Sequence, residues 1–323
     1  MKRIAMIAGN GLSMDLRKWA APQLEKWNPQ SPLQWDLYTP GKLNVPLLQS
    51  LPQFAGVISS LRQEEPDMSD FDIFKRSLRL VKIEGTRSFN QGILEVEMQH
   101  FLAIAYSYFQ LQVDQINLNS WPWFKWINTY GNNIQGIVSF NYDLVIESSL
   151  RQSGVSVKRF GVRSEVAGVD TLKPHGSIDF DIEGIVCPVG YPMNNVISRN
   201  NCPLKHLERD EFLNPRTEAD IVLPNEYSSQ LNLQWVKPGF DWFHLAGPEF
   251  THCIIVGLSY WNCDRPEIDY LLNSLSTRTK MIVANTSPSP LLMAKLRKKF
   301  HKVKVWKNGP EDLAYSGQTF GDL

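Results

Sequence analysis

Short apolar runs alternate with amphipathic segments along most of the chain. Runs of strand length occur at 4–8, 134–140, 155–160, 251–256 and 279–284, with a strand-like stretch in 171–182 and an edge-like strand at 303–305. Helical spacing of apolar residues follows at about 91–112, 144–153, 266–275 and 288–300. Continuous apolar runs are typical of strands that are buried on both faces of a parallel sheet. The alternation predicts an α/β fold, a Rossmann-like doubly wound parallel sheet with helices on both faces.

Two stretches interrupt this alternation. Prolines recur from residue 19 to about residue 65, and the region from about 183 to 248 is rich in Pro and Asn with little periodicity. Both compositions are typical of irregular connections rather than of sheet strands. We expect one domain over 1–323, with a core at about 1–16, 134–182 and 251–306, helical and irregular inserts at 17–133 and 183–250, and a loosely held tail at 307–323.

Charge and composition exclude several classes of function. The chain has 33 basic and 33 acidic residues and a formal net charge of zero, which disfavours nucleic acid as a direct partner. No apolar window approaches the roughly 20 residues of a membrane span, and no export signal is expected. None of the four cysteines forms a C-x-x-C pair, and no histidine has a partner at metal-ligand spacing. We expect a cytoplasmic protein without a metal site or a membrane contact.

Polar clusters follow four of the predicted strands. They are Gly9 to Ser13, Asn141 to Asp143, Gly257 to Ser259, and the pair Asn285 and Thr286. In open parallel sheets, ligands bind outside the carboxyl ends of the strands, so these clusters should converge on one crevice.

Each candidate residue has a structural alternative. The turn at Gly9 and Gly11 offers backbone N–H groups near a helix start for a phosphate, but it also suits a bare tight turn. Asn141 and Asp143 are suited to hold ribose hydroxyls or a water, or Asp143 caps the next helix. His175 can exchange a proton near neutral pH, or it is a satisfied structural histidine.

The order of these motifs is more specific than any one of them. A glycine turn after the first strand, Asn-Tyr-Asp, His-Gly, Gly-Leu-Ser and Asn-Thr follow one another along the chain. This order resembles the sirtuin-like superfamily, and it is most similar to the bacterial NAD-hydrolysing branch. The resemblance implies that NAD is the substrate and that no metal is needed.

The resemblance also implies a role for each motif. The pyrophosphate of NAD would lie against Gly9, Asn10, Gly11 and Ser13, with Asn10 where the family usually has Ala or Ser. The pocket for the nicotinamide ribose would contain Asn141 and Asp143, and His175 would be the catalytic histidine beside the catalytic Asn141. The adenosine half would be held by Gly257, Ser259 and Asn285.

The activity implied is that of an NAD+ glycohydrolase, a hydrolase of N-glycosyl bonds that releases nicotinamide and ADP-ribose. Such an enzyme needs control, so the resemblance implies a homo-oligomer or a separate sensor protein, as in NAD-depleting effectors of bacterial anti-phage defence. We expect the partner to dock on Trp19, Trp27 and Trp35 or on the segment 185–250.

Four alternatives remain open at this point. They are a regulatory subunit that binds NAD or ADP-ribose without turnover, an ADP-ribosyltransferase, a protein deacylase and a doubly wound dehydrogenase. The missing pairs of C-x-x-C argue against the deacylase. Met14, where the dinucleotide fingerprint has its third glycine, argues against the dehydrogenase.

Overall fold

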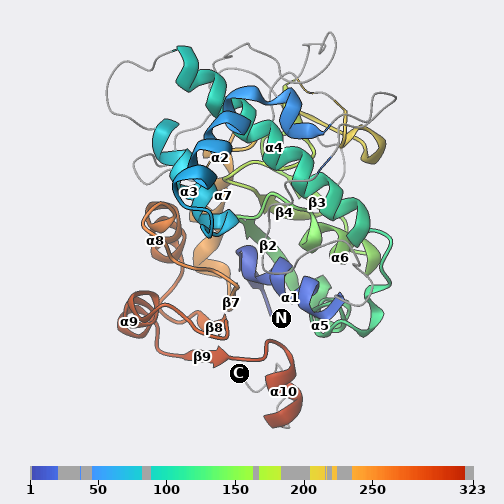
Figure 1. Cartoon of the computed structure of the whole chain (residues 1–323). Helices are drawn as coiled ribbons and strands as arrows, with labels where there is room; N and C mark the ends of the chain where they lie inside the picture. Colours follow the sequence, from blue (N-terminus) through green and yellow to red (C-terminus); the bar gives the residue numbers. More distant parts are fainter. Residues whose placement is uncertain are drawn as a thin grey trace.

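A parallel sheet forms the centre of the computed structural model, which describes residues 2–20, 37, 46–81, 89–162, 167–182, 204–214, 216, 220–223 and 235–316 (Figure 1). Within these ranges seven strands pair in the order β3-β4-β2-β1-β7-β8-β9, and every pairing is parallel. The strands are β1 (Ile4–Ala8), β2 (Ile134–Ser139), β3 (Val157–Arg159), β4 (Val169–Leu172), β7 (His252–Val256), β8 (Lys280–Ala284) and β9 (Val303–Trp306). The predicted Rossmann-like α/β fold is confirmed.

The strand order changes direction beside β1. From β1 the chain moves to β2, β3 and β4 on one side, and it then continues with β7, β8 and β9 on the other side. The gap between the carboxyl ends of β1 and β7 is therefore the topological switch point, where open α/β sheets bind their ligands. All five residues of β1 and of β7 are buried, as the apolar runs predict.

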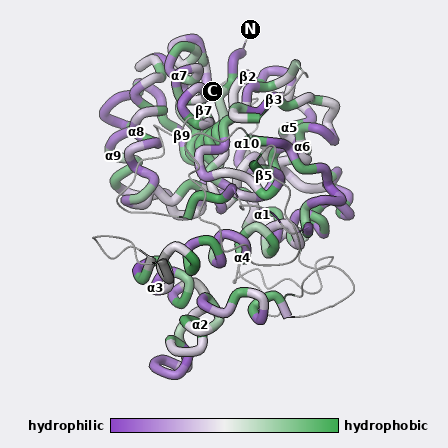
Figure 2. The backbone as a smooth tube through the Cα atoms, turned by 90° about the horizontal axis from the view of Figure 1, so that it is seen from above, coloured by the Kyte–Doolittle hydropathy of each residue, from purple (hydrophilic) through white to green (hydrophobic). Residues whose placement is uncertain are grey.

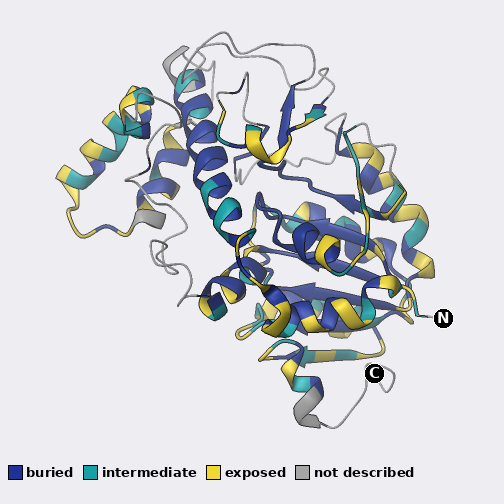
Figure 3. Cartoon of the chain, turned by 90° about the vertical axis from the view of Figure 1, so that its right-hand side faces the viewer, coloured by how far each residue is buried: buried dark blue, intermediate teal, exposed yellow. Residues whose placement is uncertain are grey.

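Helices cover both faces of this sheet, and the alternation of side chains along β1 shows how. Ile4, Met6 and Ala8 pack into one apolar cluster, while Ala5 and Ile7 pack into another. The first cluster takes in α1 (Asn10–Ala20), α5 (Pro122–Tyr130) and α6 (Val145–Gln152), and the second takes in α7 (Lys237–Ala246), α8 (Arg265–Ser274) and α9 (Pro290–Lys299). Figure 3 shows buried strands between helices with exposed outer sides.

A separate helical layer stands beside the sheet. It is made of α2 (Pro52–Glu64), α3 (Asp70–Val81) and the long helix α4 (Phe89–Val113), which share a third apolar cluster. Helix α4 joins this layer to the sheet, because Phe101 packs in the third cluster while Phe109 packs in the first. Figure 2 shows α2 and α3 projecting away from the sheet beyond α4.

Several elements differ from the sequence-based expectation. Helix α7 and strand β6 (Leu204–His206) were not predicted. The strand-like stretch expected at 171–182 contains the end of β4 and the short strand β5 (Phe180–Ile182), which pairs antiparallel with β6. Helix α2 is regular within the stretch from 19 to about 65 that we expected to be irregular. The expectation of a loosely held tail is wrong for α10 (Glu311–Ser316), because Leu313 packs into the first apolar cluster.

The unpredicted helix α7 is part of the sheet core because its aromatic residues need apolar neighbours. Phe240 and Phe243 are fully buried in the second cluster. On β2, a Cβ atom added at Gly136 would lie 2.5 Å from the ring of Trp242, so the glycine makes room for the tryptophan. Pro238 near the start of α7 fits a first-turn position, where the missing N–H is not needed.

Among the described residues no helix is both long enough and apolar enough to cross a membrane.

Helix α7 offers a direct test of this packing. We expect Phe243→Ala to lower the free energy of unfolding by about 3–5 kcal/mol, because it removes a large buried ring and leaves a cavity. The matched control is Leu245→Ala on the same helix, where the side chain is 77% exposed, and it should change the free energy by less than about 0.5 kcal/mol. Urea denaturation measures both, and equal small effects would contradict the packing described.

Candidate functional site

The polar residues predicted from the sequence lie along one edge of the sheet. Gly9 directly follows β1, Asn141 comes just after β2, and His175 comes just after β4. Gly257 and Asn285 directly follow β7 and β8. Because all five strands are parallel, their carboxyl ends meet at the same edge. We call these ends and the turns after them the carboxyl edge.

Three glycines allow two turns of the carboxyl edge to touch. The Gly9 amide donates to the Val256 carbonyl and the Gly11 amide donates to the Gly257 carbonyl, both at 2.9 Å. A Cβ atom at Gly11 would lie 2.5 Å from the Gly257 Cα atom, and Gly257 itself has a φ of +60°. The glycines are therefore required by backbone contact.

This contact corrects one sequence-based expectation. The N–H groups of Gly9 and Gly11, which we expected to face a phosphate, are used to bind the end of β7. Asn10, the first residue of α1, is exposed between them. An anion at this turn has to be held by other N–H groups of the first turn of α1.

Ser13, Asn141 and Asp143 form a buried polar cluster, which we call the Ser–Asn–Asp cluster. The Asn141 amide nitrogen donates to the Ser13 hydroxyl at 3.0 Å. Ser13 also hydrogen-bonds the carboxylate of Asp143, which in turn accepts from the Val145 amide at 3.2 Å. Two acceptors, Asn141 Oδ1 and Asp143 Oδ2, are buried without a hydrogen-bond partner among the described residues.

Lys173 lies close to Asp143 and lowers the pKa of its carboxyl, while its own ion pair is with Glu147. Burial raises the pKa of Asp143, while Lys173, Ser13, the Val145 amide and Arg17 oppose that rise. The fully buried ammonium of Lys173 donates to the Asp143 carbonyl at 2.5 Å and to the Glu147 carboxylate at 3.1 Å. Glu147 is thus the ion-pair partner of a lysine.

Asp143 binds the Val145 amide just inside α6, while α6 has Leu144 as its N-cap.

Arg17 is a member of this neighbourhood that the sequence analysis missed. It lies one helical turn after Ser13 on α1, and its buried guanidinium sits 4.3 Å from the ring centre of Phe109. Burial lowers the pKa of Arg17, and the charges of Tyr106 and Asp143 oppose this effect. The spacing of four residues from Ser13 is the signal that could have placed it on the same helix face.

His175 lies on the carboxyl edge, in the segment after β4. The ring of Phe140, the residue before Asn141, meets the imidazole edge-on with 5.1 Å between the ring centres. His175 Nε2 lies 3.8 Å from Asp264 Oδ1, a carboxylate in the turn before α8. The sequence analysis missed Asp264 as well, because an aspartate before a helix is typical of a cap.

The turn after His175 requires its glycine. Gly176 has a φ of +82°, and a Cβ atom there would lie 1.9 Å from the Asp220 carbonyl oxygen. The same segment fixes the backbone of His175, whose carbonyl accepts from the Val222 amide at 2.9 Å.

A buried ion pair lies next to the turn at His175 and Gly176. Ser177 donates to Asp179 at 2.5 Å, and Asp179 pairs with Arg159 of β3 and with His206 of β6. Although burial acts in the opposite direction, Arg159 and His206 lower the pKa of Asp179 to about 2.

The two remaining predicted positions lie near β7 and β8. Asn285 donates to the Leu258 carbonyl at 3.2 Å and accepts from the Ser287 amide, so its side chain fixes the two turns together. Ser259 is exposed on the β7–α8 turn. The next residue, Tyr260, has a φ of +53°, a conformation that costs a non-glycine residue about 1 kcal/mol.

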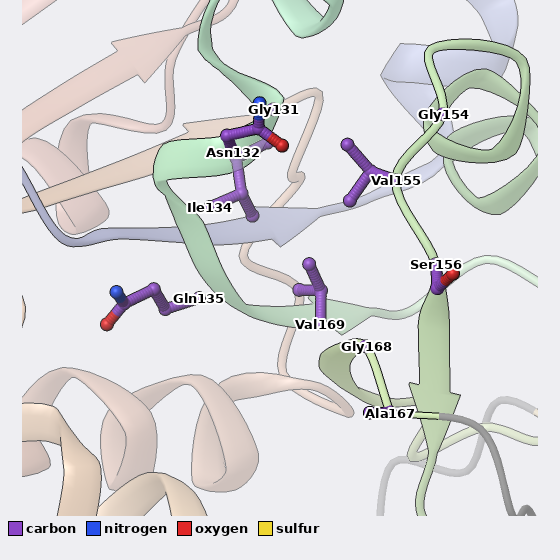
Figure 4. A pocket seen from close by; sticks show the side chains of 10 residues that line it. All are labelled: Gly131, Asn132, Ile134, Gln135, Gly154, Val155, Ser156, Ala167, Gly168 and Val169. Carbon is purple, nitrogen blue, oxygen red and sulfur yellow. The ribbon is translucent and has the colours of Figure 1, made fainter.

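A hollow of about 380 Å³ lies at the opposite, amino edge of the sheet (Figure 4). It is lined by residues at the starts of β2 and β4 and before β3, including Ile134, Val169 and Val155. None of the predicted site residues lines it.

The described residues contain no group of three or more His, Cys, Asp or Glu side chains that could hold a metal ion. Burial raises the pKa of the Cys253 thiol, and Cys263 lies in the β7–α8 turn. Cys187 and Cys202 lie outside the described residues, as do Trp27 and Trp35 of the expected docking surface. Trp19 packs against the first apolar cluster.

Comparison with known proteins gives structural neighbours alone. No protein-family model matches the chain, and no curated protein matches it. A Sir2 homologue in complex with NAD is 10% identical with a TM-score of 0.38, over 97% of this chain and 86% of that one. A mutant Sir2 homologue in complex with ADP-ribose is 10% identical with a TM-score of 0.40, over 97% of this chain and 88% of that one. Sir2Tm bound to a propionylated peptide is 12% identical with a TM-score of 0.40, over 98% of this chain and 93% of that one.

The ion pair under the His175 turn generates a prediction about pH. Because the pKa of Asp179 lies below its ordinary value of 3.8, the ionised carboxylate stabilises the fold above about pH 4, and this contribution is lost as the pH falls toward 2. We expect Asp179→Asn to cost about 2–3 kcal/mol of unfolding free energy at pH 7. The difference from the wild type should shrink between pH 5 and pH 2 in urea titrations.

The matched control is Asp170→Asn. Asp170 pairs at 3.6 Å with Lys158, which is half-exposed, so this change should cost less than about 1 kcal/mol. If both variants had the same pH dependence, the stabilising role of Asp179 would be wrong.

Proposed function

We propose that this chain is an NAD+ glycohydrolase of the sirtuin-like superfamily, which cleaves the nicotinamide–ribose bond of NAD at the carboxyl edge. The products are nicotinamide and ADP-ribose. NAD is the substrate, and the chain uses its own side chains for the chemistry.

One observation carries the proposal: the Ser–Asn–Asp cluster holds two buried acceptors without partners. Asn141 Oδ1 and Asp143 Oδ2 have no hydrogen-bond partner in the described residues, and a buried acceptor left unpaired costs about 1–3 kcal/mol. Ribose hydroxyls are donors that satisfy such oxygens. Both atoms lie next to the switch point of the sheet, where dinucleotides bind in doubly wound folds.

Burial of this cluster suits the substrate. The nicotinamide ring of NAD is cationic before cleavage, and positive charge moves to the ribose as the bond breaks. The carboxylate of Asp143 stabilises such charge in a site of low dielectric. The ammonium of Lys173 donates to the Asp143 carbonyl and to the Glu147 carboxylate. Because these two contacts bind it, the ammonium does not face the ribose.

The reaction needs a water and a base. The bond from ribose C1′ to the nicotinamide nitrogen breaks, and its electron pair neutralises the ring. A water oxygen bonds to C1′, and His175 takes the proton that this water releases. Asn141, next in sequence to the Phe140 ring that touches His175, orients the ribose or the water.

The histidine favours an enzyme over a simple binding subunit. Holding NAD requires hydrogen-bond donors and acceptors, which the Ser–Asn–Asp cluster provides without His175. An imidazole that is mostly buried and faces a carboxylate is the arrangement that a general base needs. Transfer of ADP-ribose to another acceptor would use the same residues and differs only in the nucleophile.

A glycohydrolase of this kind depletes NAD, so its activity has to be controlled. We propose that the chain is the NAD-depleting effector of a bacterial anti-phage defence system and that it acts in the cytoplasm. A homo-oligomer or a separate sensor protein would switch it on. The Trp-rich stretch that includes Trp19, or the segment 185–250, would be the docking surface. Aromatic residues are favoured at such surfaces.

Two substitutions test the residue roles. We expect Asn141→Ala and His175→Ala to lower kcat for nicotinamide release by at least about 100-fold, because each removes a group that acts in the transition state. Chromatography of nicotinamide measures turnover, and calorimetry measures NAD binding, which His175→Ala should retain.

The matched controls are Asn132→Ala and His301→Ala, two exposed residues away from the carboxyl edge, and both should keep wild-type turnover. Near wild-type hydrolysis by His175→Ala would overturn the assignment of the base. NAD binding without turnover by the wild-type chain, with or without its partner, would favour the regulatory subunit. ADP-ribose attached to protein would favour the transferase.

A further inference from the structure

Helix α4 contains a glutamine whose polar side chain is buried. Gln99 is 1% exposed, and neither its Nε2 nor its Oε1 atom has a hydrogen-bond partner among the described residues. We propose that Gln99 binds the carboxamide of nicotinamide and thereby selects the intact dinucleotide. This inference rests on the proposed function, because it names a further group that recognises the same substrate.

Gln99 lies on the face of α4 that is turned toward the carboxyl edge. Tyr106 follows it after two helical turns and Gln110 after three, so the three side chains share one face. The ring of Tyr106 meets the ring of Tyr142 edge-on, with 5.4 Å between the ring centres. Gln110 accepts from the Leu144 amide at 2.8 Å. Both partners flank the aspartate of the Ser–Asn–Asp cluster in sequence.

The position of Gln99 along α4 leaves room for more than a ribose. A helix rises about 1.5 Å per residue, so Gln99 lies about 10 Å farther along α4 than Tyr106. This end of α4 belongs to the helical layer, in which Phe101 packs, whereas Phe109 packs in the first cluster at the sheet. Gln99 is therefore displaced from the Ser–Asn–Asp cluster in the direction away from the sheet. A ligand whose ribose binds the cluster can extend toward it.

The groups without partners in these two places differ in chemistry. Asn141 Oδ1 and Asp143 Oδ2 are acceptor oxygens, which ribose hydroxyls satisfy. A glutamine amide presents an acceptor and a donor side by side. Its complement is a second amide, which accepts from Nε2 and donates to Oε1 through two hydrogen bonds. The carboxamide of nicotinamide is such a group, and it lies beyond the ribose on the ring that leaves.

Adenine also presents a donor beside an acceptor, but its expected place is elsewhere. The adenosine half is assigned above to Gly257, Ser259 and Asn285, which follow β7 and β8. These two strands lie on the other side of β1 from β2. Gln99 shares its helix face with residues that contact the turn after β2. Nicotinamide is therefore the amide-bearing part of NAD on the side of the sheet that Gln99 faces.

A neighbouring carboxylate on α4 shows what a structural contact looks like in this helix. Glu97 Oε1 is also buried without a partner, but Glu97 Oε2 accepts from the Phe54 amide at 2.7 Å, at the start of α2. Gln99 makes no such contact with the described residues. A buried amide without hydrogen bonds destabilises the unliganded chain. This cost is removed when a bound ligand supplies the partners.

Calorimetry on the full chain tests the assignment, in a His175→Ala background that prevents turnover during the titration. Gln99→Leu should weaken NAD binding about 10-fold or more, because it removes two hydrogen bonds, and should leave ADP-ribose binding within about twofold. ADP-ribose lacks nicotinamide but retains adenine and both riboses. The matched control is Gln112→Leu, a partly buried glutamine on the opposite face of α4, which should change neither affinity.

A dinucleotide analogue locates the contact on the ligand. In 3-acetylpyridine adenine dinucleotide a methyl group replaces the amide nitrogen, so this group no longer donates. The chain with Gln99 should bind the analogue about 5-fold more weakly than NAD, because one hydrogen bond is lost. Gln99→Leu should bind NAD and the analogue equally, since the two changes remove the same interaction.

Stability distinguishes a binding role from a structural one. Because the amide of Gln99 has no partner among the described residues, Gln99→Leu should leave the urea midpoint unchanged or raise it. A lower midpoint, an unchanged affinity for NAD, or an equal loss for NAD and ADP-ribose would overturn the inference. The expected binding pattern without release of nicotinamide by the chain that retains His175 would contradict the proposed hydrolysis alone. A chain that binds no NAD would contradict both.

Discussion

The carboxyl edge depends on one close backbone contact, between the turn after β1 and the end of β7. Gly9 and Gly11 donate to the carbonyls of Val256 and Gly257, and a side chain at either Gly11 or Gly257 would collide with the other turn. This contact joins the two halves of the sheet at the point where the strand order changes direction. It also sets where α1 begins, and thereby where Ser13 meets Asn141.

Buried charged groups lie near Asp143 and next to the turn that carries His175. Lys173, Glu147 and Arg17 lie beneath or beside Asp143, and the ion pair of Asp179 and Arg159 supports the turn that carries His175. Replacing a whole buried pair by apolar residues often changes stability little, whereas removing one partner destabilises the fold because it leaves the other charge buried and unpaired. Asn141 Oδ1, Asp143 Oδ2 and Glu147 Oε2 are buried acceptors without a hydrogen-bond partner among the described residues. A polyhydroxyl substrate would complete what the protein leaves unpaired.

The sequence predicted the centre of the sheet well because β1 and β7 are fully buried and appear in the sequence as continuous apolar runs. It also placed Ser13, Asn141, Asp143 and His175 at one edge, since parallel strands bring their carboxyl ends together. Contacts between distant segments were not predictable in this way. Arg17 lies near Asp143, and Asp264 lies near His175. In both cases the neighbour is far away in sequence, so no local pattern could indicate the contact.

Local signals also misled in places. Helix α7 was missed because Pro and Gly near its start are typical of a loop, whereas its aromatic residues pack on the sheet. The glycine turn was expected to offer its amides to a phosphate, and the close approach of β7 uses two of them instead. In both cases tertiary packing overrides the local pattern.

The central claim is that water attacks the ribose of NAD at the carboxyl edge. The most direct measurement is mass spectrometry of the products after the purified chain, with its partner if it needs one, is incubated with NAD. We predict release of nicotinamide together with an equal amount of free ADP-ribose. ADP-ribose found on another acceptor in place of free ADP-ribose, or a chain that neither cleaves nor binds NAD, would contradict the account.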